Sequence, residues 1–407
     1  MKYCLIGEKL GHSYSQVIHS GQGLDYQLVE VEKDGLEEFV KTCPDGFNVT
    51  IPYKKDIIKY LDEVDESARQ VGAVNTVLKK NGKLYGYNTD VYGYNTDVYG
   101  MEYALQRAKI DLLGKTVLIL GSGGTSLTAR YVCKRAGAKT TLVVSRKGEI
   151  NYENCYDVKA DVIINTTPVG MYPNVEGCAV DLERFKGLKG VFDCVYNPLR
   201  TNLILQAQKL GINCSGGLPM LVAQGLKAEE IWLDKNIESS VYEDVINSLE
   251  KEKRNIVLIG MPSCGKTSVA KAVASITGKK VVDTDQTVFE VEGETPSEII
   301  TKYGESVFRE KESLAVSKVA TESGVIIATG GGAVLRRENV TALKRNGYLI
   351  YLERAIEKLV DDDRPLSKNG AISRLFEQRK PIYESVCDKK VSNDGDISDT
   401  VKEILSL

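Results

Sequence analysis

The chain has 407 residues, of which 42% are hydrophobic and 27% charged, and its formal net charge is −3. This length predicts two or three domains, and the composition is that of a soluble globular protein. No basic stretch is dense enough to favour nucleic acid or an anionic membrane as a partner. The nine cysteines never form a C-x-x-C pair, which favours a reducing compartment over a disulfide framework or a zinc site. No apolar run is long enough to span a membrane and the N-terminus has no targeting character, so we expect a cytoplasmic protein.

The first fifty residues alternate between predicted strands and predicted helices. A strand at residues 3–6 is followed by hydroxyl side chains at Ser13 and Ser15. Such hydroxyls can hold a polyol or a carboxylate, and they can equally cap the helix that follows. A strand at residues 26–30 and a helix at residues 36–41 come next.

A second polar region follows in Asn48-Val-Thr-Ile-Pro-Tyr-Lys54, where a lysine lies just beyond a strand that ends at a proline. Asn81-Gly82 then predicts a hairpin with a two-residue turn. Counting outward from that turn, Lys80 faces Lys83 and Asn75 faces Asn88. The open end of this hairpin therefore gathers amide side chains.

Residues 1–250 resemble the shikimate dehydrogenase family. The resemblance is carried by His12-Ser-x-Ser15, Asn48-Val-Thr-x-Pro-x-Lys54, Gly72-Ala-Val-Asn-Thr76 and Asn88-Thr-Asp90. In that family a lysine and an aspartate form the catalytic pair, which implies Lys54 and Asp90 here. The residues that the resemblance assigns to shikimate binding are Ser13, Ser15, Thr50, Lys54, Asn75, Asp90, Tyr196 and Gln224.

The segment Tyr87-Asn-Thr-Asp-Val-Tyr-Gly93 is repeated verbatim at residues 94–100, whereas the family has one copy. The first copy keeps the family's distance from the hairpin, and the second keeps its distance to the glycine-rich turn downstream. Either Asp90 or Asp97 can therefore take the catalytic role. Hairpin register favours Asp90, because Asp97 lies well beyond any pairing with Asn75. The surplus either extends the next helix by about two turns or loops out.

A dinucleotide-binding pattern follows. A strand at residues 117–120 leads into a glycine-rich turn and a helix that ends near Arg135, and a second strand covers residues 140–144. Where an NAD site would place a carboxylate for the ribose 2′-OH, this strand ends in Arg146 and Lys147, which favours NADP. Family resemblance adds two residues near the nicotinamide, and the predicted NADP-binding residues are Gly121, Ser122, Gly123, Gly124, Thr125, Ser145, Arg146, Lys147, Gly217 and Met220.

The segment Gly260-Met-Pro-Ser-Cys-Gly-Lys-Thr267 fits the phosphate-loop pattern between a predicted strand (256–259) and a predicted helix (269–276). Backbone N–H groups and the helix N-terminus bind phosphate, and the lysine reaches the outer phosphates. Asp283 and Asp285 lie two apart on the next predicted strand and so point the same way. Such a pair could hold Mg²⁺ or orient an attacking hydroxyl. The predicted ATP-binding residues of the loop are Ser263, Cys264, Gly265, Lys266, Thr267 and Ser268, with Thr267 and Asp283 as candidate Mg²⁺ ligands.

Residues 255–400 resemble the shikimate kinase family. The motifs are the phosphate loop, Asp283-Thr-Asp285, Arg309-x-x-Glu312, Gly330-Gly-Gly332, Arg364-Pro-Leu366 and Arg379-Lys-Pro-x-Tyr383. The resemblance implies that Asp285 binds the hydroxyl to be phosphorylated and that Arg309 and Arg379 clamp the substrate carboxylate. It also implies that Gly331 and Gly332 approach the ring and that Arg364, in a lid, meets ATP phosphates. Residues 361–363 are all aspartate where the family is more basic, which predicts weaker ATP binding or slower closure.

We therefore expect an α/β protein with three domains. Residues 1–100, with closing helices at 221–250, form a substrate-binding domain, residues 101–220 a Rossmann NADP-binding domain, and residues 255–407 a P-loop kinase domain with a parallel sheet.

The two resemblances imply a bifunctional enzyme that reduces 3-dehydroshikimate with NADPH and phosphorylates shikimate with MgATP. Its predicted catalytic residues are Lys54, Asp90 or Asp97, Lys266 and Asp285. Three alternatives stay open: a kinase whose dehydrogenase half is impaired by the repeat, a quinate-preferring dehydrogenase that uses NAD, and a quinate or shikimate sensor. The predicted partners are small molecules, and the oligomeric state is open between monomer and homodimer.

Overall fold

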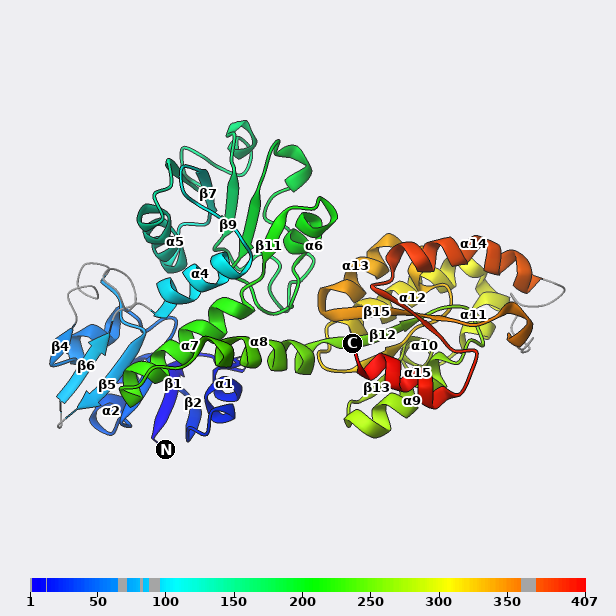
Figure 1. The fold of residues 1–407 in the computed structure, drawn as a ribbon, viewed down its shortest axis with the longest axis horizontal. Helices are drawn as coiled ribbons and strands as arrows, with labels where there is room; N and C mark the ends of the chain where they lie inside the picture. The colour runs from blue at the N-terminus through cyan, green and yellow to red at the C-terminus, as the bar shows by residue number, and fades with distance from the viewer. Residues whose placement is uncertain (1, 12, 65–71, 81–82, 88–95, 360–370) are drawn as a thin grey trace. The chain divides into compact units, whose positions relative to one another are not determined.

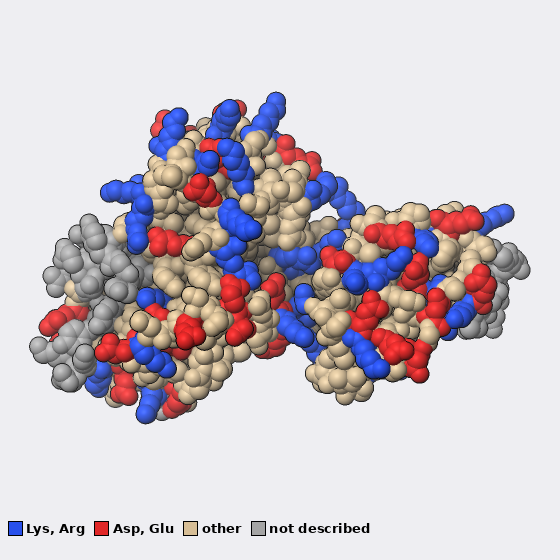
Figure 2. Space-filling model, in the orientation of Figure 1, with Lys and Arg blue, Asp and Glu red and all other residues tan. Residues whose placement is uncertain are grey.

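A computed structural model describes residues 2–11, 13–64, 72–80, 83–87, 96–359 and 371–407. The chain forms two compact units, Met1–Asn197 with Gln206–Leu249 and Pro198–Leu205 with Glu250–Leu407. Both units are α/β, as the sequence predicted, and their described residues form three sheets (Figure 1). Within the described ranges no helix is both long and apolar enough to cross a membrane. On the face drawn in Figure 2, cationic and anionic side chains are interspersed.

The first sheet of unit one is mixed. Its strand order is β2-β1-β3-β5-β6-β4; β1 pairs in parallel with β2 and β3, whereas β5 runs antiparallel to β3 and β6. Lys80 pairs with Lys83, so the hairpin register predicted from Asn81-Gly82 is confirmed, although the two turn residues lie outside the described residues. The strands are β1 (Tyr3–Gly7), β2 (Tyr26–Glu30), β3 (Gly46–Val49), β4 (Glu63–Val64), β5 (Thr76–Lys80) and β6 (Lys83–Tyr87).

The second sheet of unit one is entirely parallel, with the order β11-β10-β9-β7-β8. Its central strands are buried on both faces, which is why the sequence shows them as short continuous apolar runs. The strands are β7 (Thr116–Leu120), β8 (Thr140–Val144), β9 (Val162–Asn165), β10 (Gly190–Asp193) and β11 (Asn213–Ser215).

Two helices of unit one, α4 and α7, pack closely against each other (Figure 1). Gly100 makes the approach possible, because a Cβ there would lie 2.5 Å from the carbonyl oxygen of Met220. Helix α4 begins at Thr96, so the second copy of the repeat supplies its first turn. The helices of this unit are α1 (Ser15–Gly21), α2 (Leu36–Lys41), α4 (Thr96–Arg107), α5 (Gly124–Arg135), α7 (Leu218–Leu233) and most of α8 (Ser239–Lys253); α6 (Asn202–Lys209) straddles the boundary between the units.

Unit two is built on a parallel sheet with the order β13-β14-β12-β15-β16 and with helices on both faces (Figure 1). Its core consists mainly of strand side chains packed against α9, α12, α13 and α15. The strands are β12 (Asn255–Ile259), β13 (Val281–Asp283), β14 (Ile326–Ala328), β15 (Gly347–Glu353) and β16 (Lys389–Ser392). The helices are α9 (Lys266–Thr277), α10 (Thr284–Glu292), α11 (Pro296–Tyr303), α12 (Glu305–Ala320), α13 (Arg337–Asn346), α14 (Ala371–Val386) and α15 (Ile397–Leu405).

Candidate active sites

The first candidate site centres on a lysine–aspartate pair in unit one. Lys54 Nζ donates a hydrogen bond to Asp97 Oδ2 at 2.9 Å, and the two side chains are 33% and 19% exposed. The lysine is held by its neighbours, since its backbone carbonyl accepts from the N–H of Val74 at 2.6 Å and the adjacent Tyr53 is fully buried. Asp97 lies in the first turn of α4. A cation and an anion thus meet at a partly exposed position, where they can exchange protons with a bound molecule.

This contact corrects one premise of the sequence argument. The hairpin register placed Asp97 beyond reach of Asn75, yet the amide Nδ2 of Asn75 donates to Thr96 Oγ1 at 3.1 Å. The premise is wrong because the link does not run through strand pairing: the side chains at the start of α4 bond directly to that of Asn75. Asp90 lies outside the described residues, so Asp97 is the aspartate that the structure places beside Lys54.

The other predicted shikimate-binding residues of unit one fall into two groups. Gln224 accepts from the hydroxyl of Thr96 at 3.4 Å, which brings it to the group of Asn75 and Asp97. Ser13 and Ser15 lie at the start of α1, and their hydroxyls are 3.1 Å apart.

The two remaining described residues of this set, Tyr196 and Thr50, lie beside Tyr14 and Gly7. Tyr196 lies beside Tyr14, with ring centroids 5.3 Å apart, and so is next to the serine group. Thr50 follows β3 with its N–H bonded to Ile6, and its methyl group would be 2.7 Å from a Cβ on Gly7. These contacts therefore form two clusters: Asn75, Thr96 and Gln224 lie in one, and Ser13, Ser15 and Tyr196 lie in the other.

The predicted NADP-binding residues lie at the carboxyl ends of β7 and β8. Gly121 has φ +101°, and a Cβ there would be 2.8 Å from the methyl carbon of Thr167, so both conformation and space require glycine. Helix α5 begins directly after this turn, and its N-terminus is suited to an anion. Arg146 and Lys147 follow β8 and are exposed. These residues fit a dinucleotide with an additional phosphate on its ribose.

The remaining predicted NADP residues lie on or near α7. Gly217 precedes the helix, and a Cβ there would be 2.2 Å from the carbonyl oxygen of Cys194. Met220 is 8% exposed and packs in the same hydrophobic core as β7 and β9. Glycine is therefore needed at 217 for close packing against the end of β10.

The second candidate site is the phosphate loop of unit two. Gly260, Ser263 and Gly265 have φ values of +146°, +61° and +96°, which turn the loop back over the start of α9. Lys266 is 8% exposed, and its ammonium donates to the carbonyl oxygens of Gly260 and Met261 at 3.0 and 2.8 Å. The charge is therefore held inside the loop, where phosphate oxygens would lie.

Asp283 and Asp285 do not share a strand face, contrary to the prediction. β13 ends at Asp283, and Asp285 lies in the first turn of α10. The reason is helix capping, because Asp283 Oδ1 accepts from the N–H of Asp285 at 2.9 Å and so starts the helix. Asp283 Oδ2 accepts from the Thr267 hydroxyl at 3.0 Å, whereas Asp285 Oδ1 would be 2.6 Å from a Cβ on Gly330. Asp283 therefore faces Thr267 at the end of the phosphate loop, and Asp285 faces Gly330 of the triple glycine.

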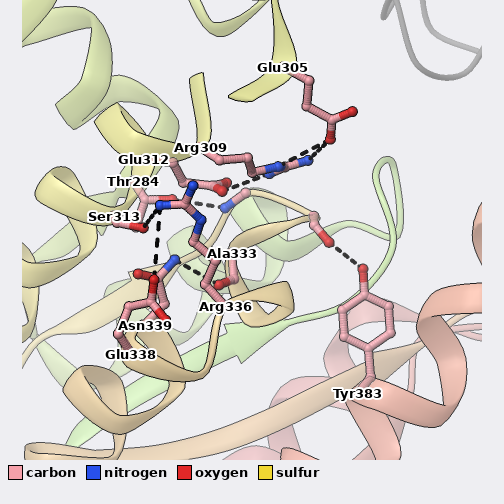
Figure 3. A network of polar contacts seen from close by, with 12 residues as sticks. Thr284, Glu305, Arg309, Glu312, Ser313, Ala333, Arg336, Glu338, Asn339 and Tyr383 are labelled. Carbon is pink, nitrogen blue, oxygen red and sulfur yellow. Dashed lines mark hydrogen bonds and ion pairs between the residues drawn. The ribbon is translucent and has the colours of Figure 1, made fainter. Parts of the chain in front are cut away.

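Arg309 on α12 lies between two carboxylates (Figure 3). It donates to Glu312 Oε2 at 2.6 Å and to Glu305 Oε1 at 2.8 Å. Among the described residues, Glu312 Oε1 is buried without a hydrogen-bond partner. Burial raises the pKa of Glu312, the Asp285 charge raises it further, and the Arg309 guanidinium opposes the shift. A Cβ on Gly332 would lie only 2.1 Å from Arg309 Nη1, so any side chain there would displace the guanidinium.

Arg379 lies on α14 and is 5% exposed. Burial raises the pKa of Tyr383, and the charge of Arg379 opposes this shift. The Tyr383 hydroxyl donates to the carbonyl oxygen of Gly331 at 2.5 Å (Figure 3). The charges of Arg309 and Arg379 both oppose the rise in the pKa of Glu312 that burial causes. Arg364 and the neighbouring aspartates lie outside the described residues.

The structure adds residues to which the sequence assigned no role. Thr96 hydrogen-bonds the side chains of Asn75 and Gln224. Asn48, which already stood in a motif, donates to the hydroxyl of Thr76 beside Asn75. In unit two, Asn393 donates to the carbonyl oxygen of Cys264 at 2.8 Å, and Arg354 Nη1 would be 3.6 Å from a Cβ on Gly265. Residues that border the phosphate loop from distant strands leave no local signal. Among the described residues, no cluster of three or more His, Cys, Asp or Glu side chains could hold a metal ion by itself.

Comparison with known proteins assigns both parts of the chain. The family model of the shikimate dehydrogenase substrate binding domain matches residues 5–77, and that of shikimate kinase matches residues 262–407. The shikimate dehydrogenase (NADP(+)) of Clostridium perfringens (strain SM101 / Type A) is 39% identical over 269 residues, which cover 59% of this chain and 97% of that protein.

Solved structures agree with this assignment. Shikimate dehydrogenase 1 from Peptoclostridium difficile is 35% identical with a TM-score of 0.55, covering 61% of this chain and 97% of that one. Shikimate 5-dehydrogenase from Thermus thermophilus, solved in complex with NADP(H) and shikimate, is 28% identical with a TM-score of 0.52, covering 60% and 98%. The chain therefore belongs to the shikimate dehydrogenase family and continues into a shikimate kinase domain, so it is a fusion of the two.

Proposed function

We propose that this chain catalyses two consecutive steps, the NADPH-dependent reduction of 3-dehydroshikimate and the MgATP-dependent phosphorylation of shikimate. The observation that carries the proposal is the presence in one chain of a Lys54–Asp97 pair beside amide side chains and of a phosphate loop beside Asp285 and Arg309. The first constellation suits a ketone in a polyol ring, and the second suits a hydroxyl in a carboxylate-bearing ring.

In the dehydrogenase reaction the chain's own part is proton delivery and orientation. NADPH, when bound, supplies the hydride that reduces the ketone carbon. Lys54 polarises the carbonyl oxygen and gives it a proton as the alcohol forms, while Asp97 stabilises and orients the ammonium. Asn75 and Gln224 orient ring hydroxyls. In the oxidation direction the same lysine takes the proton back.

The cofactor preference is proposed from the end of β8. Arg146 and Lys147 are exposed there, at the place where a ribose 2′ substituent of a bound dinucleotide would lie. Two cations favour a phosphate over a hydroxyl, which supports NADP over NAD. The name of the Clostridium perfringens relative includes the same cofactor.

In the kinase reaction the chain mainly positions groups and neutralises charge. ATP, when bound, supplies the phosphoryl group. Lys266 compensates phosphate charge, and Thr267 with Asp283 would hold Mg²⁺. Asp285 accepts the proton of the attacking hydroxyl. Arg309 and Arg379 bind the carboxylate of shikimate.

Two single substitutions test the proposal in the full-length chain. Lys54→Met should abolish NADPH oxidation with 3-dehydroshikimate and leave ADP formation with shikimate unchanged, and Lys266→Met should do the reverse. Loss of both activities in either variant, or neither activity in the wild type, would refute a bifunctional enzyme. The Lys54–Asp97 contact argues against the alternative of a dehydrogenase impaired by the repeat, because Lys54 has an aspartate partner despite the insertion.

A further inference from the structure

A continuous line of buried polar side chains runs from β2 to the dehydrogenase site. The hydroxyl of Tyr26 donates to Asn48 Oδ1 at 2.8 Å, and Asn48 Nδ2 donates to Thr76 Oγ1 at 3.2 Å. Thr76 donates in turn to Asn75 Oδ1 at 3.0 Å. From there the line continues through Thr96 to Gln224, as described above. Tyr26, Asn48, Asn75, Thr76 and Thr96 are each at most 6% exposed.

The directions of these bonds follow from two contacts with backbone carbonyl groups, one made by Asn48 and one by Gln224. Asn48 Nδ2 also approaches the backbone carbonyl oxygen of Asn75 at 3.4 Å, and Gln224 Nε2 donates to that of Leu221 at 3.1 Å. A carbonyl oxygen can only accept, so both amide nitrogens must face these carbonyls. Asn48 therefore turns its oxygen to Tyr26, and the single hydroxyl protons of Thr76 and Thr96 point toward Asn75 and Gln224.

Tyr26 itself has no freedom to turn away. Its ring stacks on His19 with centroids 4.1 Å apart, and His19 Nδ1 lies 2.7 Å from Glu229 Oε1. Trp232 packs against the same ring at 6.1 Å between centroids. The hydroxyl is thus held at one place by aromatic packing, and the packing does not depend on the hydroxyl.

We propose that Tyr26 is a positioning residue of the dehydrogenase, which acts through Asn48 and Thr76 to keep the amide nitrogen of Asn75 turned toward α4. In this orientation Asn75 offers an N–H to a ring hydroxyl of the substrate, which must then act as the acceptor. The inference rests on the proposed dehydrogenase function and adds to it what orients the Asn75 amide toward a hydroxyl of the substrate. Asn75 uses its oxygen for Thr76, so a rotated amide would present the wrong group.

Tyr26→Phe tests this inference because it removes the hydroxyl and keeps the ring. Asn48 Oδ1 then loses its hydrogen-bond donor in a buried place, and one lost bond of this kind corresponds to about a tenfold effect. We expect kcat/KM for shikimate oxidation to fall about tenfold through KM for shikimate, with KM for NADP unchanged. Tyr242→Phe is the matched control, since Tyr242 is 1% exposed and its hydroxyl lies 3.4 Å from Glu230.

A double-mutant cycle separates positioning from a general loss of stability. In an Asn75→Ala background the amide is gone, so adding Tyr26→Phe should cause no further loss of kcat/KM. Thr76→Val removes the hydroxyl that joins Asn48 to Asn75 and changes the side-chain shape little. It should also raise KM for shikimate, and it replaces Tyr26→Phe in the test if that variant does not fold. Unchanged KM for shikimate in both variants, or a full tenfold loss that persists in the Asn75→Ala background, would overturn the proposal. An inactive wild type would instead refute the dehydrogenase function itself.

Discussion

Replacing Asp97 by alanine is the most direct test of how the repeat is used. The carboxylate accepts a hydrogen bond from the Lys54 ammonium at 2.9 Å, and both groups are at most one-third exposed. A hydrogen bond between charged groups contributes about 1.5–3 kcal/mol. If this contribution is made fully in the transition state, its loss lowers kcat/KM by about 10- to 150-fold.

The comparison variant is Asp90→Ala, in the other copy of the same seven-residue segment. Hairpin register predicts that this variant is the worse one, whereas the contact of Asp97 with Lys54 predicts the opposite order, with the larger loss of kcat/KM in Asp97→Ala. NADPH formation from shikimate would be followed by absorbance at saturating NADP. Kinase activity of the same preparations serves as an internal measure of active protein.

Loss of activity in Asp90→Ala with activity kept in Asp97→Ala would refute the role assigned to Asp97. Equal losses in both variants would also contradict it, because only one aspartate lies beside Lys54 in the described residues. A conservative variant adds a second criterion. Asp97→Asn keeps an oxygen that can accept from Lys54 but removes the charge, so it should fall between wild type and Asp97→Ala.

Three further predictions concern other parts of the chain. Deleting residues 94–100 yields the same polypeptide as deleting the first copy, and we expect this single-copy enzyme to retain dehydrogenase activity, because the remaining aspartate keeps the spacing on both sides. Loss of NADPH formation in that variant would show that the insertion is needed. Replacing both Arg146 and Lys147 by alanine should raise KM for NADP at least about tenfold and leave KM for NAD nearly unchanged, since charged hydrogen bonds to the phosphate are lost. Equal effects on the two cofactors would contradict the assignment. Gly332→Ala should raise KM for shikimate in the kinase reaction with little effect on dehydrogenase rates, because the new methyl carbon would be 2.1 Å from Arg309 Nη1; unchanged kinase kinetics would refute this steric argument.

Local chemistry explains why many elements could be predicted from the sequence. β2 and α2 have the predicted bounds, and Lys80 lies opposite Lys83, because strand alternation, helix length and an Asn-Gly turn depend on neighbouring residues. The phosphate loop is equally local, since its glycines and Lys266 act within one turn. Its function could therefore be inferred before any tertiary contact was known.

Predictions that depended on the start of a helix were less successful. Asp285 was expected on a strand, but the side chain of Asp283 caps α10 and places Asp285 in the helix. The sequence also leaves open whether the surplus of the repeat extends the next helix or loops out, because two identical copies give identical local signals; in the structure α4 begins at Thr96. Competition between a strand and a capped helix is decided by which hydrogen bonds are made, and pattern alone does not contain that information.

By itself, the sequence determined the two nucleotide-binding patterns, the α/β class and the candidate residues around each site. Only the tertiary structure decided which copy of the repeat meets Lys54, and that Tyr26, Asn48 and Thr76 lie behind Asn75. The physical reason is the distance along the chain: these hydrogen bonds join a strand, a hairpin and a helix that no short-range pattern relates. Such bonds form only once apolar packing has brought the elements together.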